Sequence, residues 1–158
     1  MLEIGNSAPD FSLLDQDEVK HHKDDYIGGW WLVYFYPKDD TPGCTKEACT
    51  IAEVYEEFSK LNVKVVGVSK DSTRSHKKFA EKYNLPFTLL SDSEGKMIEA
   101  YGAFKEKSMY GKTFMGIDRV SYLIDPKGLV ARTYPKVDPA THAHILLEDI
   151  KSLQSNND

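Results

Sequence analysis

The alternation of apolar and polar stretches predicts strands and helices that follow one another along the first half of the chain. Seven apolar residues run without interruption from Trp30 to Tyr36, between Gly28-Gly29 and Pro37. A run this short and this aromatic is typical of a buried central strand. Val63 to Val68 is rich in β-branched residues and predicts a second strand.

Between these two strands the apolar residues follow a helical period. From Thr41 onward they recur at offsets 0, 4, 7, 8, 11 and 14, namely at Cys44, Ala48, Ile51, Ala52, Tyr55 and Phe58. These positions form one face of an amphipathic helix. Strand, helix and strand therefore make a βαβ unit, which should be parallel and right-handed. A second helix is expected after Ser72, which can cap it, and should end at Asn84 before Pro86.

The second half of the chain predicts shorter elements. In chain order we expect a short strand at Phe87–Leu90, a short helix at Glu94–Tyr101, an ordered loop at Gly102–Gly116, an antiparallel hairpin formed by Arg119–Ile124 and Leu129–Tyr134, and a final helix. The hairpin is favoured by its turn sequence, Asp125-Pro126-Lys127-Gly128. The final helix should have Asp138 as its cap and Pro139 at its first position.

Together these elements predict an α/β fold with a central mixed sheet, parallel in its first half and antiparallel in its second, and with helices on both faces. The outline is thioredoxin-like. The chain has 158 residues, within the usual range for one domain, and no repeat or Pro/Ser-rich linker divides it. We therefore expect one domain over residues 1–158, with a loose polar tail after Leu153.

Composition narrows the classes of partner. The net charge of −5 and the pI near 5.5 argue against a nucleic-acid or anionic-membrane surface as the main partner. The longest apolar run is far shorter than the roughly 20 residues that span a bilayer. The amino terminus lacks a basic flank followed by an apolar stretch, so we expect no secretory signal and a cytoplasmic location. Two cysteines five positions apart are too few for a disulfide scaffold and more typical of a reactive pair.

Cys44 lies where the first strand leads into the long helix. Read as a helix start, Thr41 is the cap, Pro42 the first helical residue, Gly43 the second and Cys44 the third. In a capping box this third position holds a carboxylate that reaches the free amides of the first turn. Here it holds a thiol, and the same N–H groups and the helix dipole favour its thiolate. The alternative is a small, inert core residue, which would leave the preceding cap, proline and glycine unexplained.

The spacing of the two cysteines does not decide the role of Cys49. Five residues along a helix rise about 7.5 Å and rotate about 500°, which puts the two Cα atoms roughly 8.7 Å apart. A disulfide requires less than about 7 Å. Cys49 is therefore either a passive helix residue or a resolving thiol that is reached by local unfolding.

Arg119 opens a strand that is otherwise mostly apolar. A guanidinium beside the Cys44 turn would favour the thiolate and donate hydrogen bonds to an oxygen substrate. By spacing alone, an arginine at a strand edge in water explains the residue better. The loop before it is locally basic, with Lys105, Lys107 and Lys112, a pattern that is also common on solvated surfaces.

The stretch from Tyr34 to Cys49, YFYPKDDTPGCTKEAC, resembles the active-site signature of peroxiredoxins, and specifically of the bacterioferritin comigratory protein or peroxiredoxin Q subfamily. Further similar segments are Ala8-Pro9-Asp10-Phe11, Gly67-Val68-Ser69, Leu89-Leu90-Ser91-Asp92 and Gly116-Ile117 through Asp125. The resemblance thus covers most of the chain.

The resemblance implies a thioredoxin fold and a peroxidase that reduces hydrogen peroxide and organic hydroperoxides without metal, haem, flavin or other cofactor. It implies Cys44 as the peroxidatic cysteine and Cys49 as the resolving cysteine, with Thr41 and Arg119 binding the peroxide and Pro37 closing the pocket against water. The disulfide would be recycled by thioredoxin or a similar dithiol. The subfamily resemblance suggests a monomer, and a surface aromatic patch could instead make a dimer.

Three other classes compete with this interpretation. A general disulfide reductase normally needs Cys-x-x-Cys, which the chain lacks. A metal module is disfavoured because neither His21 with His22 nor His142 with His144 would present both rings to one ion, while His76 is expected to be a partly buried helix residue. A holdase that has the same fold but no peroxidase activity is disfavoured, because the peroxiredoxin active-site signature is intact.

Overall fold

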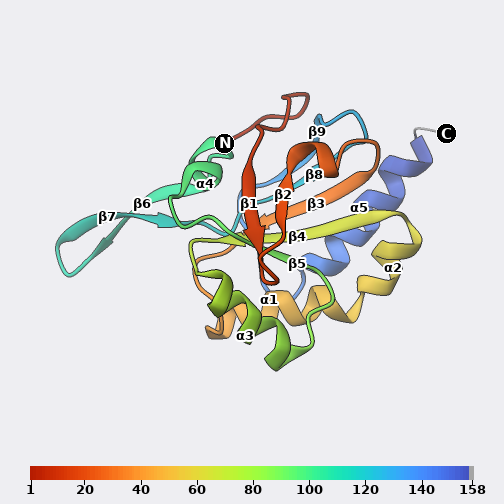
Figure 1. Cartoon of the computed structure of the whole chain (residues 1–158). Coiled ribbons are helices and arrows are strands. Elements are labelled where there is room, and N and C mark those ends of the chain that lie inside the picture. Colours follow the sequence, from red (N-terminus) through yellow and green to blue (C-terminus); the bar gives the residue numbers. More distant parts are fainter. Residues whose placement is uncertain (157–158) are drawn as a thin grey trace.

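A seven-stranded mixed sheet in the order β2-β1-β5-β4-β3-β8-β9 forms the centre of the molecule, of which the computed structural model describes residues 1–156 (Figure 1). Its strands are β1 (Ser12–Asp15), β2 (Lys20–His22), β3 (Trp30–Phe35), β4 (Val63–Ser69), β5 (Thr88–Ser91), β8 (Ser121–Ile124) and β9 (Val130–Tyr134). β3 pairs with β4, and β4 with β5, in parallel, whereas every other pair in this sheet is antiparallel. The mixed sheet expected from the sequence is confirmed, but its first half is not wholly parallel, because β1 pairs antiparallel with both β2 and β5.

The helices are α1 (Pro42–Glu53), α2 (Tyr55–Lys60), α3 (Thr73–Tyr83), α4 (Lys96–Ala100) and α5 (His142–Asn156), with one 3-10 turn, η1 (Lys23–Asp25). α1 connects β3 to β4, which confirms the βαβ unit. Ser72 caps α3, because its side chain accepts a hydrogen bond from the amide of Ser75, and Asn84 ends the helix in the left-handed conformation. None of the helices described over residues 1–156 is both long and apolar enough to cross a membrane.

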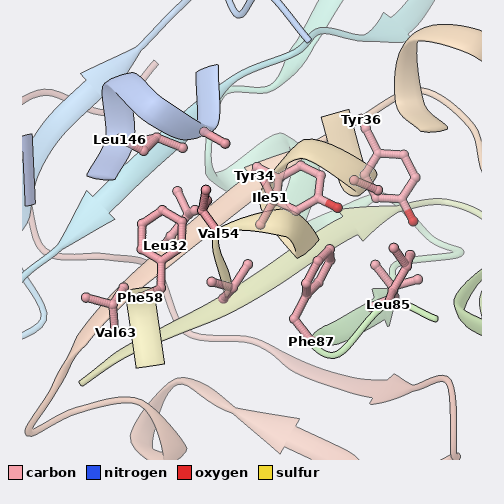
Figure 2. Close-up of a cluster of buried hydrophobic side chains, with 14 of the residues drawn as sticks. Leu32, Tyr34, Tyr36, Ile51, Val54, Phe58, Val63, Leu85, Phe87 and Leu146 are labelled. Atoms are coloured by element: carbon pink, nitrogen blue, oxygen red, sulfur yellow. The ribbon is translucent and has the colours of Figure 1, made fainter. Parts of the chain in front are cut away.

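Alternation along β3 divides the core into two layers. Leu32 and Tyr34 face α1, α2, α3 and α5, and their cluster is drawn in Figure 2. Trp31 and Val33 point to the opposite face, which is covered by α4 and by the segment before β1. Helices therefore lie on both faces, as expected. Each fully buried large apolar side chain contributes about 1.5–3 kcal/mol to folding, so β3 is held firmly from both sides.

Several boundaries differ from the sequence-based expectation. The helix expected to run through Phe58 is interrupted at Val54, whose backbone (φ −108°, ψ 11°) separates α1 from α2. The final helix begins at His142 rather than Pro139. Asp138 still accepts hydrogen bonds before its start, with its carboxylate from the amide of Ala140 and with its carbonyl from the amides of Thr141 and His142. The expectation of a loose tail after Leu153 is wrong as far as Asn156, since α5 continues and Gln154 donates a hydrogen bond to the carbonyl of Leu61.

The expected loop at Gly102–Gly116 is wrong. This segment forms the hairpin of β6 (Phe104–Met109) and β7 (Lys112–Ile117), a separate two-stranded sheet. Its turn is Tyr110-Gly111, and both residues have positive φ (52° and 76°), the conformation of a two-residue type I′ turn. The hairpin projects from the body of the molecule (Figure 1), so neither face needs the alternating apolar residues by which a strand is recognised in sequence.

Candidate active site

The candidate site lies where the chain passes from the end of β3 to the start of α1. The structure puts Thr41 at the N-cap, Pro42 and Gly43 at the first two helical positions and Cys44 at the third, as the sequence predicts. The expected side-chain cap is wrong, however, because the Thr41 hydroxyl donates instead to the carbonyl oxygen of Lys38 at 2.8 Å. The Thr41 hydroxyl proton is therefore already used in a hydrogen bond, and the lone pairs of the hydroxyl oxygen can still accept one.

The first turn of α1 presents backbone donors beside a buried sulfur. Since no side chain caps this turn, the N–H groups of Gly43 and Cys44 have no partner within the described residues 1–156. Cys44 is 1% exposed and shares the inward stripe of α1 with Ala48 and Ile51. The thiol is thus enclosed by the core and belongs to the turn whose amides are free, the end of a helix at which an anion is stabilised.

Arg119 reaches this turn from the segment just before β8. A Cβ atom added to Gly43 would lie 2.5 Å from Nη2 of Arg119, so the guanidinium packs directly against Gly43 and a side chain there would displace it. Nη1 lies 3.4 Å from Oε1 of Glu47, and the Arg119 side chain is 24% exposed. The structure therefore brings Arg119 beside the Cys44 turn, although the two are far apart in the sequence.

Two further residues of the site are missing from the sequence-based prediction. Glu47 is 1% exposed, and its Oε2 has no hydrogen-bond partner among the residues described. Burial raises the pKa of this carboxyl to about 7, against the lowering effect of Arg119. Tyr34, beneath α1, also has a buried hydroxyl with no partner in residues 1–156, and burial together with the charge of Glu47 raises its pKa well above the usual range. A signal for Glu47 was available, because it lies three residues after Cys44 on the same side of the helix.

The raised pKa of Glu47 predicts a specific dependence of stability on pH. Because the folded protein favours the protonated carboxyl, this group's contribution is fully present below about pH 4.5 and is lost as pH rises to about 7. A shift from 4.5 to about 7 corresponds to about 3 kcal/mol. Urea unfolding of the wild type and of Glu47→Gln at pH 5 and pH 8 should show the wild type losing more stability than the variant. Parallel losses in both proteins would contradict the raised pKa.

Cys49 and Pro37 lie at the margin of the site. Both cysteines are free and belong to one continuous helix, and Cys49 is half-buried on the flank of α1. Burial and the neighbouring Glu53 raise the pKa of Cys49, while Lys46 lowers it, so its thiol stays protonated in the helix. Pro37 follows β3 and is exposed, at the rim of the loop that leads to Thr41.

A buried hydrogen-bonded cluster holds the loop before Thr41. Nδ1 of His76 lies 2.7 Å from Oδ2 of Asp39, and Nε2 lies 2.9 Å from the carbonyl oxygen of Leu90. The backbone amide of Asp39 donates to the carboxylate of Asp71. The carboxylate of Asp39 accepts hydrogen bonds from the hydroxyls of Tyr36 and Ser75. His76 is fully buried rather than partly buried as expected.

This cluster also contains the group closest to a metal-binding arrangement. Asp39, Asp71 and His76 offer ligand atoms within 4.8 Å of one another. Each of the three side chains already takes part in hydrogen bonds, which explains the grouping as an anchor for the loop. Of the other histidines, His21 bonds to Asp15 and Tyr26, and His142 bonds to Ser121.

Comparison with known proteins assigns the chain to a family. The model of the AhpC/TSA family matches residues 4–133. A putative peroxiredoxin Bcp from Coxiella burnetii is 46% identical over 141 residues, which is 89% of this chain and 93% of that protein. The chain is a peroxiredoxin of the AhpC/TSA family. Peroxiredoxin Bcp from Bacillus subtilis is 43% identical over 96% of this chain and 97% of that protein.

Solved peroxiredoxin structures share the fold along almost the whole chain. The bacterioferritin comigratory protein of Xanthomonas campestris, described in terms of its alkyl peroxide reduction activity, has a TM-score of 0.89 and 37% identity, covering 96% of this chain and 97% of that one. A peroxiredoxin Q variant from Xylella fastidiosa has a TM-score of 0.92 and 32% identity, with 98% of each chain covered. The thioredoxin-like fold expected for this peroxiredoxin is thereby confirmed. As a peroxiredoxin, it takes a peroxide as substrate and a thiol as reductant.

Proposed function

We propose that this peroxiredoxin reduces hydrogen peroxide and organic hydroperoxides through the thiolate of Cys44. The observation that supports this most directly is the position of Cys44, buried at the third residue of α1 with uncapped backbone amides and Arg119 around it. These groups stabilise negative charge on sulfur and on a departing oxygen alike. The alkyl peroxide reduction ascribed to the Xanthomonas relative supports organic hydroperoxides as substrates.

In the first step the Cys44 thiolate attacks one oxygen of the hydroperoxide and the O–O bond breaks. Sulfur becomes a sulfenic acid, and the other oxygen leaves as water or alcohol after taking up a proton. Arg119 and the free first-turn amides face the growing negative charge. The Thr41 hydroxyl, which donates its proton to the backbone carbonyl of Lys38, accepts a hydrogen bond from a peroxide O–H. In this proposal Pro37, at the rim, limits access of water once substrate is bound.

In the second step Cys49 condenses with the sulfenic acid, forming a disulfide and releasing water. Both cysteines lie in the single helix α1, where residues five apart are too distant for a disulfide, so α1 has to unwind locally. Unwinding also removes the burial that raises the pKa of Cys49, which makes its thiol easier to ionise. Thioredoxin or a similar dithiol then reduces the disulfide. We place this cycle in the cytoplasm, where free cysteines such as these are kept reduced.

The proposal is tested by oxidising the reduced protein with one equivalent of hydrogen peroxide. We expect a Cys44–Cys49 disulfide by mass spectrometry together with a partial loss of helical circular dichroism. Cys49→Ser is the matched variant: it should consume about one equivalent, keep its helical signal and accumulate sulfenic or more oxidised Cys44. Full thioredoxin-dependent turnover by Cys49→Ser would show that Cys49 is not the resolving thiol.

A general disulfide reductase is the nearest alternative on this fold. The two cysteines are held in one helix five residues apart, rather than in the Cys-x-x-Cys spacing on which such enzymes depend. Insulin reduction without added peroxide separates the two activities, and we expect none above background.

A further inference from the structure

The β6–β7 hairpin carries an unusual concentration of exposed apolar side chains. Tyr110 is 97% exposed, Met115 62%, Met109 58% and Phe114 46%, all within seven consecutive residues. The hairpin stands clear of the sheet and helices (Figure 1), so these side chains do not cover the core. Exposed apolar groups gathered in this way are typical of a protein interaction site, and flexible methionines suit a surface that adapts to a partner.

The pairing register of the hairpin places its lysines on one face. Lys105 lies opposite Gly116, Lys107 opposite Phe114, and Met109 opposite Lys112. Residues directly opposite each other share a face, and faces alternate along a strand. One face, here called the basic face, therefore consists of Lys105, Lys107, Met109, Lys112 and Phe114 and has no carboxylate.

The charge of the basic face is opposite to that of the rest of the molecule. Three lysines and one glutamate give residues 104–117 a net charge of +2, and since the whole chain carries −5, the remaining residues carry −7. An acidic protein is therefore repelled by most of the surface and attracted to the hairpin. Such complementarity acts chiefly on the rate and orientation of encounter.

The base of the hairpin lies beside the active site. β7 ends at Ile117, two residues before Arg119, whose guanidinium packs on Gly43 in the first turn of α1. Lys107 donates to the carbonyl of Ile117, and Lys105 pairs with Asp118 at 3.6 Å, so two of the lysines also fix the base. Lys112, near the tip, makes no ion pair within the described residues and is available to a partner.

We propose that the basic face docks the protein dithiol that reduces the Cys44–Cys49 disulfide, a partner with carboxylates and apolar groups around its own cysteines. This inference rests on the proposed function. A thiolate of the docked partner attacks one sulfur of the disulfide, and its second thiol then displaces that sulfur. Both cysteines return to thiols, and the partner leaves with the disulfide, so two electrons and two protons are transferred.

The test compares a protein reductant with a small one. The variant Lys112→Glu/Phe114→Ser changes the basic face, and Lys151→Glu/Ile145→Ser on α5 is the control, with the same change of charge and an isoleucine that is similarly exposed (49%). With thioredoxin as reductant, we expect the hairpin variant to show an about tenfold higher KM for thioredoxin, a loss of about 1.4 kcal/mol in binding. Turnover with dithiothreitol and the single-turnover consumption of peroxide should match the wild type, and the control should be unaffected.

Three outcomes would overturn the proposal. The first is an unchanged KM for thioredoxin in the hairpin variant. The second is an equal loss with thioredoxin and dithiothreitol, which would indicate damage to the site itself. The third is that the wild type sediments as a dimer, the hairpin variant sediments as a monomer, and the KM for thioredoxin is the same in both. The basic face would then be a contact between copies of the chain. Failure of the proposed function is distinct, because the wild type would then consume no peroxide with either reductant.

Discussion

Replacing Cys44 by serine is expected to abolish peroxide consumption. A serine hydroxyl is not ionised at neutral pH and cannot be converted to a sulfenic acid, so the backbone donors of α1 have no thiolate to stabilise. We expect the rate of peroxide consumption by the reduced protein to fall at least about a thousandfold. The fold should persist, because serine and cysteine differ little in size and the 1% exposed site keeps its neighbours.

The measurement is peroxide remaining after mixing with one equivalent of fully reduced protein. Cys49→Ser serves as the control for this experiment, since it keeps the nucleophile and should remove about one equivalent. If Cys44→Ser also removed one equivalent, the nucleophile would lie elsewhere and the proposed function would be wrong. Near-ultraviolet circular dichroism of Cys44→Ser, with so many buried aromatic rings in the core, checks that the variant is folded.

Replacing Arg119 by methionine is expected to slow the first oxidation of Cys44 by about 10²–10³-fold. The guanidinium is the cation packed on the first turn of α1, and loss of one preorganised donor to a developing oxyanion has an effect of this size. The same change removes the ion-pair partner of buried Glu47, which lies 3.4 Å from Arg119. We therefore also expect a stability loss of about 1–3 kcal/mol above pH 7, where Glu47 would otherwise ionise.

The double variant Arg119→Met/Glu47→Gln separates these two effects. Glutamine carries no charge, so stability should recover, while the oxidation rate should stay low because the cation is still missing. Stopped-flow oxidation and urea unfolding at pH 8 measure the two quantities independently. A double variant that regains the rate along with the stability would show that Arg119 acts only through folding.

The start of α1 could be predicted from sequence because its determinants are local. Thr41, Pro42 and Gly43 each restrict the backbone within one turn, and they fix Cys44 at the third helical position. The strands β3 and β4 were equally clear, since continuous apolar runs are required where both faces of a sheet are covered. The structure confirms these elements to within one or two residues.

The partners of Cys44 could not be predicted in the same way, because they depend on contacts distant in sequence. Arg119 was singled out at a strand edge, but its position over Gly43 follows from the pairing of β3 with β8. Glu47 was missed because a buried carboxylate contradicts the rule that charges lie outside. The β6–β7 hairpin was missed because its two faces are both polar in part, although Tyr110-Gly111 offered a turn signal.

The hydrogen bonds of Asp39 limit where the chain can unwind in the proposed cycle. Since the chain before Thr41 is tied to α3 and to the ends of β4 and β5, the unwinding that brings Cys44 and Cys49 together is confined to α1 itself. When the disulfide is reduced, this stretch refolds between an anchored loop and the later residues of α1, so both of its ends are already held. Starting a helix is the unfavourable part of forming one, whereas extending it takes nanoseconds per residue. We therefore expect the reduced site to form again quickly once the reductant departs.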